Sequence, residues 1–88
     1  MSKILVIIPT YNESENISKM ISDIKSVSEN YHILVVDGNS NDNTVDIVKK
    51  IISKSDNMFL IQQNKKNGIG GAYCEGFAFA IKNKYLKV

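Results

Sequence analysis

The sequence is poor in cysteine and in long apolar runs, and each shortage excludes a class of protein. A single cysteine among 88 residues allows neither an internal disulfide bond nor a metal cluster built from cysteines. No apolar stretch approaches the roughly 18 residues that a membrane-spanning helix needs. The chain also runs from Met1-Ser2-Lys3 straight into a strand-like segment, so we expect no secretory signal peptide.

Arginine is absent, and the excess of positive charge is small. Eleven basic residues, all lysine, stand against nine acidic ones, which leaves a net charge of +2. Binding to duplex nucleic acid requires basic side chains gathered against several phosphates, so we expect no nucleic-acid partner. With 43% hydrophobic and 23% charged residues, the composition is that of a folded protein, and residues 1–88 are expected to form a single domain.

Short apolar runs rich in β-branched residues predict buried parallel strands. They cover residues 3–8, 33–36 and 58–61, and the run Tyr85–Val88 resembles the beginning of a fourth strand. Between them, apolar residues recur every three or four positions, which is typical of helices. The order βαβαβαβ predicts an α/β fold, in which a parallel sheet is covered by helices on both faces: a three-layer αβα, Rossmann-like arrangement.

Capping residues and apolar spacing predict where the helices lie. Asn12, followed three residues later by Glu15, predicts a capping box for the first helix. The second helix is expected over about residues 44–53, with Asp42 or Asn43 as its cap. The third helix is expected to turn one apolar face toward the sheet, with Tyr73 and Phe77 in the core. The residues of this face are Ile69, Ala72, Tyr73, Gly76, Phe77, Ala80 and Ile81.

Ligands of such sheets bind beyond the carboxyl ends of the strands, where the loops 9–14, 37–44 and 63–71 are expected to meet. A dinucleotide site would need G-x-G-x-x-G after the first strand, and a P-loop would need Gly-Lys-Ser/Thr. Neither pattern occurs in the chain. These two common phosphate-binding sites are therefore excluded.

The three loops nevertheless carry groups suited to a nucleotide. The first offers an aromatic ring and a carboxylate, Tyr11 and Glu13, and the second a carboxylate at a strand end, Asp37. The third offers Lys65 and Lys66 just before a helix, where backbone N–H groups also favour anions. An aromatic platform, carboxylate acceptors and a positive helix start together suit a nucleoside diphosphate.

Three stretches of the chain resemble the family 2 glycosyltransferases. They read VIIPTYNESENI, VVDGNSNDNT and KKNGIGGAYCEGFAFAI, and the last is similar to the dolichol-phosphate mannose synthase branch. The resemblance implies a truncated GT-A fold with strand order 3-2-1-4, whose first half binds the nucleotide of a nucleotide-sugar. The family's paired aspartates are here Asp37 and Gly38, and Gln63 stands where an arginine is often found.

The resemblance also implies a set of nucleotide-binding residues. The first loop would contact base and ribose, Asp37 would hold base or ribose, and the third loop would lie near base and diphosphate. The implied residues are Pro9, Thr10, Tyr11, Glu13, Asp37, Gly38, Lys66 and Gly70. Asp42 and Thr44 are instead expected to cap the second helix, and Lys65 and Lys66 have the alternative role of solvated loop charges.

The family's D-x-D motif, which binds a divalent Mg or Mn ion, would follow the fourth strand, and no acidic pair in this chain replaces it. The resemblance therefore implies the donor-binding half of an inverting hexosyltransferase, inactive as an isolated chain. The donor would be GDP-mannose or a UDP-sugar, and the acceptor a polyprenyl or dolichyl phosphate. The implied location is cytoplasmic, at the cytosolic membrane surface for a longer parent.

Two alternatives remain open from the sequence. The chain could be a non-catalytic nucleotide-binding or assembly module, or a truncated gene remnant. The outer edge of the expected fourth strand, Tyr85–Val88, would be unpaired, and an unpaired apolar edge is a template for pairing with another chain. We therefore expect a homo-oligomer at high protein concentration, formed through this edge or the apolar surface beside it.

Overall fold

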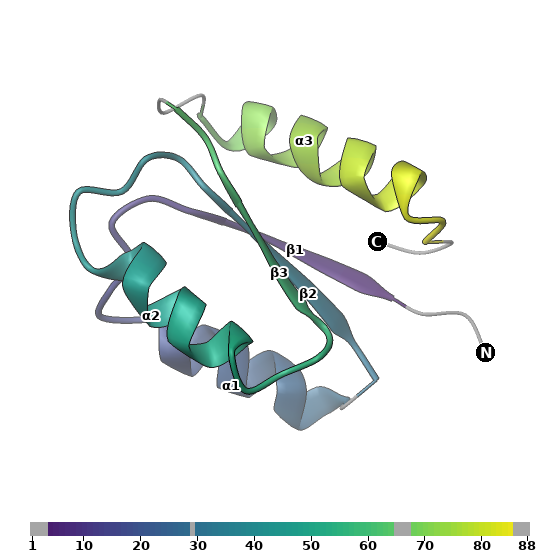
Figure 1. The fold of residues 1–88 in the computed structure, drawn as a ribbon, viewed down its shortest axis with the longest axis horizontal. Helices are drawn as coiled ribbons and strands as arrows, with labels where there is room; N and C mark the ends of the chain where they lie inside the picture. Colours follow the sequence, from purple (N-terminus) through teal and green to yellow (C-terminus); the bar gives the residue numbers. More distant parts are fainter. Residues whose placement is uncertain (1–3, 29, 65–67, 86–88) are drawn as a thin grey trace.

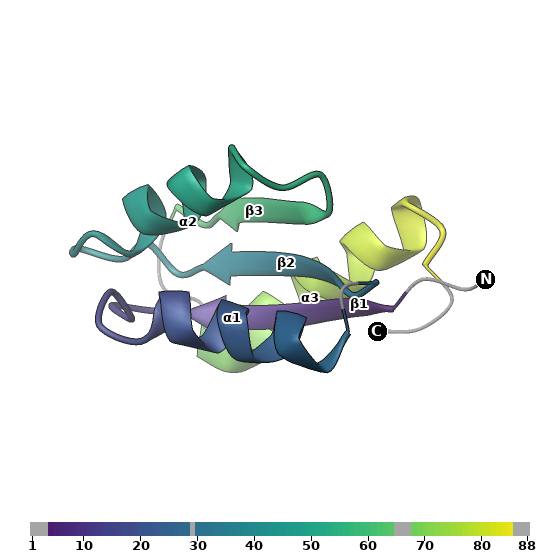
Figure 2. The ribbon, with the colours of Figure 1, turned by 90° about the horizontal axis from the view of Figure 1, so that it is seen from below.

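The computed structural model describes residues 4–28, 30–64 and 68–85. Its three strands, β1 (Leu5–Thr10), β2 (His32–Asp37) and β3 (Met58–Gln62), form a parallel sheet in the order β1-β2-β3. All three arrows point the same way in Figure 2, so the loops that follow the strands gather at one edge. The strand positions agree with the apolar runs of the sequence, within a few residues at each end.

Helices cover both faces of the sheet, as Figure 1 shows. Helices α1 (Ile17–Val27) and α2 (Thr44–Ile52) lie on one face, and α3 (Gly68–Lys82) lies on the other. Two separate apolar clusters fill the spaces between the layers. The first, beneath α1 and α2, consists of Ile8, Ile17, Ile21, Ile33, Val35, Val48 and Met58. The second, beneath α3, consists of Leu5, Ile7, Leu34, Val36, Ala72 and Ala80.

The three-layer αβα arrangement is thus observed, and the order 3-2-1 within the expected 3-2-1-4 is confirmed. The expected fourth strand falls mostly on residues 86–88, which lie outside the described residues. Tyr85 itself is not part of a strand. Its N–H donates to the carbonyl of Ala80, and its hydroxyl lies 2.6 Å from His32 Nδ1, so Tyr85 fastens the end of α3 to the sheet.

The expected capping box at Asn12 is wrong. The N-cap position of α1 belongs to Asn16, four residues after the expected cap, and no side chain caps the helix there. Asn12 instead has a left-handed backbone, with φ of 54°, and its side-chain oxygen accepts a hydrogen bond from the N–H of Asn41 at 2.8 Å. A contact with a distant loop has replaced the local capping interaction.

The expected core face of α3 is also wrong in part. Small residues face the sheet: Ala72 and Ala80 are buried, and a Cβ on Gly76 would come within 2.6 Å of the Ile7 side chain. The neighbouring row is exposed, with Tyr73 at 39%, Phe77 at 50% and Ile81 at 79%. Because small residues allow the helix backbone to approach the sheet closely, the large side chains are displaced to the helix flank.

Candidate functional site

The candidate site is built where β1 and β2 end side by side. Thr10 and Asp37 are partners in the strand register, and the Thr10 hydroxyl donates a hydrogen bond of 2.7 Å to Asp37 Oδ1. Just beyond them, the N–H of Gly38 donates to the carbonyl of Thr10. Asp37 is 1% exposed and Thr10 is 5% exposed. The carboxylate predicted to hold base or ribose therefore lies beneath the surface of the site.

Ser40 closes the loop after β2 onto this carboxylate. Its N–H donates to Asp37 Oδ2 at 2.8 Å, and its hydroxyl donates to Asp37 Oδ1 at 2.6 Å. With the bond from Thr10, the carboxylate accepts three hydrogen bonds. The same Ser40 hydroxyl accepts a hydrogen bond from the N–H of Asn12 at 2.8 Å. Ser40 thus joins the loop after β2 to the loop after β1.

Asp42 and Thr44 make a second connection between the same two loops. One oxygen of Asp42 accepts hydrogen bonds from the N–H and the hydroxyl of Thr44, and the other accepts from the N–H of Ser14 at 3.2 Å. The Thr44 hydroxyl oxygen accepts from the N–H of Glu13 at 2.9 Å. The hydroxyl of Thr44, aided by these N–H groups, lowers the pKa of the Asp42 carboxyl to about 2. The expected capping roles of Asp42 and Thr44 are thus only partly met. Asn43 occupies the N-cap position of α2 without a side-chain cap hydrogen bond, while Asp42, one residue earlier, accepts the N–H of Thr44 and the Thr44 hydroxyl binds the loop after β1.

The third strand adds a buried amide to this edge. Gln63 is 6% exposed, its N–H donates to the carbonyl of Asp37 at 2.8 Å, and its side-chain N–H donates to Glu75 of α3 at 3.0 Å. Lys65 and Lys66, the predicted diphosphate contacts, lie outside the described residues. Gly70 is exposed, and a Cβ built there would meet no atom of the described residues within 4 Å. Packing against the described part of the domain does not explain why glycine stands at this position.

The rim of the site carries the groups predicted to contact a ligand directly. Tyr11 is 36% exposed, and Pro9 and Glu13 are half-buried. The structure thus brings the first two predicted loops together. Their residues differ in burial. Thr10, Asp37 and Gly38 are buried below, and Tyr11 and Glu13 stand on the rim. No reasoning from the sequence assigned the linking roles of Asn12 and Ser40, although a serine three residues after a strand-end aspartate is a typical turn former.

The sequence pattern described as glycosyl transferase family 2 matches residues 5–86 of this chain. The chain belongs to glycosyl transferase family 2. The match extends from β1 to the residue after Tyr85, and it includes the hydrogen-bonded loops after β1 and β2. The expectation drawn from the three sequence stretches is confirmed.

Several family 2 relatives are similar to nearly the whole chain. The polyprenol monophosphomannose synthase of Mycolicibacterium smegmatis is 35% identical over 92% of this chain and 31% of its own length. The undecaprenyl-phosphate mannosyltransferase of Micrococcus luteus is 31% identical over 94% of this chain and 34% of its own length. The dolichol-phosphate mannosyltransferase of Pyrococcus furiosus is 39% identical over 96% of this chain and 24% of its own length. This chain therefore spans about a third or less of these relatives.

Glycosyl transferase family 2 enzymes are typically metal-dependent, so we tested whether the residues present fit a metal ion. Within residues 4–28, 30–64 and 68–85, no three side chains of His, Cys, Asp or Glu come together. The carboxylates of Asp37 and Asp42 already accept hydrogen bonds from neighbouring Ser and Thr groups. These residues do not fit a divalent cation. In the same described segments, no helix is long and apolar enough to span a membrane.

Proposed function

We propose that this chain forms the nucleotide-binding part of a family 2 glycosyltransferase that transfers a hexose from GDP-mannose or a UDP-sugar to a polyprenyl phosphate. In the proposed reaction, a phosphate oxygen of the acceptor attacks the anomeric carbon of the sugar. The bond from that carbon to the diphosphate breaks, and the nucleoside diphosphate leaves. The similarity to a polyprenol monophosphomannose synthase, an undecaprenyl-phosphate mannosyltransferase and a dolichol-phosphate mannosyltransferase supports this assignment.

The observation that carries the proposal is the pair of hydrogen-bonded loops at the carboxyl edge of the sheet. Open α/β sheets bind ligands at this edge, and here two neighbouring loops are held together by four hydrogen bonds between residues 12–14 and 40–44. Such bonds fix the loop backbones before a ligand arrives. Preorganisation lowers the entropy cost of binding.

Each predicted residue then has a definite task. Tyr11 and Glu13 on the rim are proposed to contact base and ribose, with Pro9 restricting the backbone before them. Asp37 acts from below, because its carboxylate accepts three hydrogen bonds and is 1% exposed. It sets the position of the loop 38–44 rather than offering a free carboxylate to the ligand. Gly70 leaves open space at the start of α3 for the diphosphate.

A nuclear magnetic resonance titration with GDP and UDP tests the proposal. We expect saturable shifts at residues 10–13, 37–39 and 70, with a dissociation constant of ~0.1 to several mM, or roughly 3–5 kcal/mol. Added Mg²⁺ is expected to change the affinity little, since the described residues hold no group of metal ligands. Tyr11→Ala is expected to weaken binding.

The control is Asp56→Ala, an exposed carboxylate before β3 at the opposite edge of the sheet, which is expected to leave binding unchanged. Saturable binding that leaves the three loops unshifted would refute the proposed site. So would binding that is equally weakened by Tyr11→Ala and by the control substitution.

A further inference from the structure

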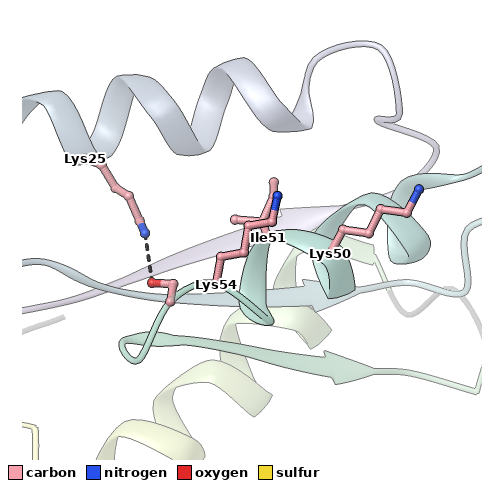
Figure 3. Close-up of a pocket in the computed structure, with 5 residues that line it drawn as sticks. Lys25, Lys50, Ile51 and Lys54 are labelled. Carbon is pink, nitrogen blue, oxygen red and sulfur yellow. Dashed lines mark hydrogen bonds between the residues drawn. The ribbon is translucent and has the colours of Figure 1, made fainter.

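A shallow pocket of about 230 Å³ lies on the α1/α2 face of the domain, away from the nucleotide loops. Figure 3 shows Lys25 on α1, Lys50 and Ile51 on α2, and Lys54 two residues after the end of α2. Ser55, just after α2, completes the lining. Both helices contribute their last turn or the residues beyond it, so the pocket is near the amino ends of the strands, opposite the edge where the nucleotide would bind.

Within the part of the chain that the structure describes, no pocket lysine forms an ion pair with a carboxylate, although Asp46 on α2 and Asp56 after Ser55 lie near in sequence. Among the described parts of the chain, the one ion pair joins Lys19 to Asp23 on the exposed side of α1. Lys25 donates a hydrogen bond of 2.9 Å to the hydroxyl oxygen of Ser55, which is a neutral partner. That bond holds the Lys25 ammonium at the pocket and uses one of its three N–H groups.

The partial negative charges at the C-termini of α1 and α2 compensate only part of the positive charge of the three lysines. The C-terminus of a helix is equivalent to about −0.5 charge, so two helix ends together offset about one of the three lysines. The carbonyls of residues 49–52, at the end of α2, already accept hydrogen bonds of 2.6 to 3.1 Å from groups of residues 53–55. The lysines are therefore not needed to cap that helix.

We propose that this pocket binds a phosphate group. Lysine ammonium groups are strong donors to phosphate oxygens. The Ser55 hydroxyl donates its proton to Asn57 and accepts a hydrogen bond from Lys25, so its role is to hold the Lys25 ammonium at the pocket. The side chain of Ile51 and the lysine stems give the pocket an apolar wall against which an attached group can rest. This site is separate from the nucleotide loops and does not depend on the proposed function.

The phosphate could belong to a soluble anion or to the headgroup of an anionic lipid, and two measurements distinguish these sources. In the first, inorganic phosphate and pyrophosphate are titrated into the protein while amide shifts are recorded. We expect saturable shifts at residues 25 and 50–55. Shifts in the nucleotide loops would report binding of the same anions at the proposed nucleotide site. The two sites are told apart because each amide signal belongs to one residue.

In the second measurement, the protein is sedimented with vesicles of phosphatidylcholine alone or with added phosphatidylglycerol. If the source is a lipid headgroup, the protein sediments with the phosphatidylglycerol vesicles and stays in solution with phosphatidylcholine alone. Raising the salt concentration is expected to release it, because exposed charges are screened.

A pair of variants with equal charge makes both measurements specific. Lys50→Gln/Lys54→Gln removes two pocket lysines, and Lys82→Gln/Lys84→Gln removes two exposed lysines at the end of α3, on the other face. We expect the pocket variant to bind phosphate or phosphatidylglycerol vesicles about ten-fold more weakly, and the control variant to bind as the original protein does. All four positions are exposed, so both variants are expected to fold, and their amide spectra check this.

The proposal is overturned if neither phosphate, pyrophosphate nor phosphatidylglycerol vesicles bind at the pocket residues. It is equally overturned if the two variants lose binding to the same extent, since attraction would then follow net charge rather than this pocket.

Discussion

Ser40 holds both oxygens of the Asp37 carboxylate, one through its backbone N–H at 2.8 Å and the other through its hydroxyl at 2.6 Å. Only two residues lie between them, so the chain turns back on itself directly after β2. Because the Ser40 hydroxyl also accepts the N–H of Asn12, one side chain fixes the shape of its own loop and its distance from the loop after β1. Ser40 therefore sets the relative position of the loops after β1 and β2.

Asp37→Ala is expected to lower the free energy of unfolding by about 2–3 kcal/mol, because the buried hydroxyl of Thr10 and the half-buried donors of Ser40 would lose a charged acceptor. Urea unfolding measures this. Ser40→Ala is expected to cost less, and the double variant less than the sum, since the two residues share the same hydrogen bonds. Strictly additive costs, or a cost no larger than that of Asp56→Ala, would show that this carboxylate does not organise the loops.

Two glycines of α3 are expected to respond oppositely to the same substitution. Gly76→Ala places a Cβ 2.6 to 3.1 Å from three carbons of Ile7, and overpacking of this kind typically costs about 1–3 kcal/mol. After the helical advantage of alanine, about 1 kcal/mol, we expect a net loss of stability. Gly70→Ala meets no atom within 4 Å and is expected to raise stability by up to about 1 kcal/mol.

The same pair separates packing from ligand binding. Gly70→Ala is expected to weaken GDP and UDP binding several-fold although the domain becomes more stable, because the added methyl group enters the space proposed for the diphosphate. Thermal unfolding and a nucleotide titration on each variant measure the two effects. Unchanged nucleotide affinity in Gly70→Ala would remove this glycine from the proposed site.

The strands and the layer order were predictable because they depend on patterns along the chain. The runs at 33–36 and 58–61 are apolar on both faces, and only a sheet covered on both sides accommodates such strands. The face of α3 was harder to predict. Rows 72-76-80 and 73-77-81 have the same helical spacing, and the choice between them depends on how closely the helix approaches Ile7, which is a tertiary property.

The side-chain hydrogen bonds that join the two loops could not be predicted from the sequence either. Asn12 and Glu15 match a capping box, yet Asn12 adopts a left-handed backbone and binds Asn41 in another loop. A local pattern cannot report a competing partner 29 residues away. The sequence predicted which loops meet, because loops that follow parallel strands share one edge, but not which side chains join them.

The carboxyl of Asp42 is expected to make stability depend on pH in acid. Its pKa is about 2 in the folded protein, below the ordinary value of 3.8, because Thr44 and Ser14 donate hydrogen bonds to the ionised form. The unfolded state then binds more protons between these two values, so this contribution is complete above about pH 4 and is lost as the pH falls toward 2. Urea midpoints from pH 6 to pH 2 measure the effect, and Asp42→Asn is expected to show a shallower decline. An identical decline in both proteins would assign the acid sensitivity to other groups.

The exposed row on α3 is expected to drive self-association. Tyr73 and Phe77 stack with their ring centroids 6.2 Å apart, and Ile81 continues the row at 79% exposure. Grouped apolar side chains of this kind typically mark a contact surface, so we expect light scattering to detect dimers or larger species at millimolar concentration.

The double variant Phe77→Ser/Ile81→Ser is expected to shift the protein toward monomer without loss of stability, since both side chains are largely exposed to water. Val27→Ser, which removes an equally exposed apolar side chain at the end of α1, is the matched control and is expected to change nothing. A protein that stays monomeric at millimolar concentration, or one whose association persists in the double variant, would exclude this row as the contact surface.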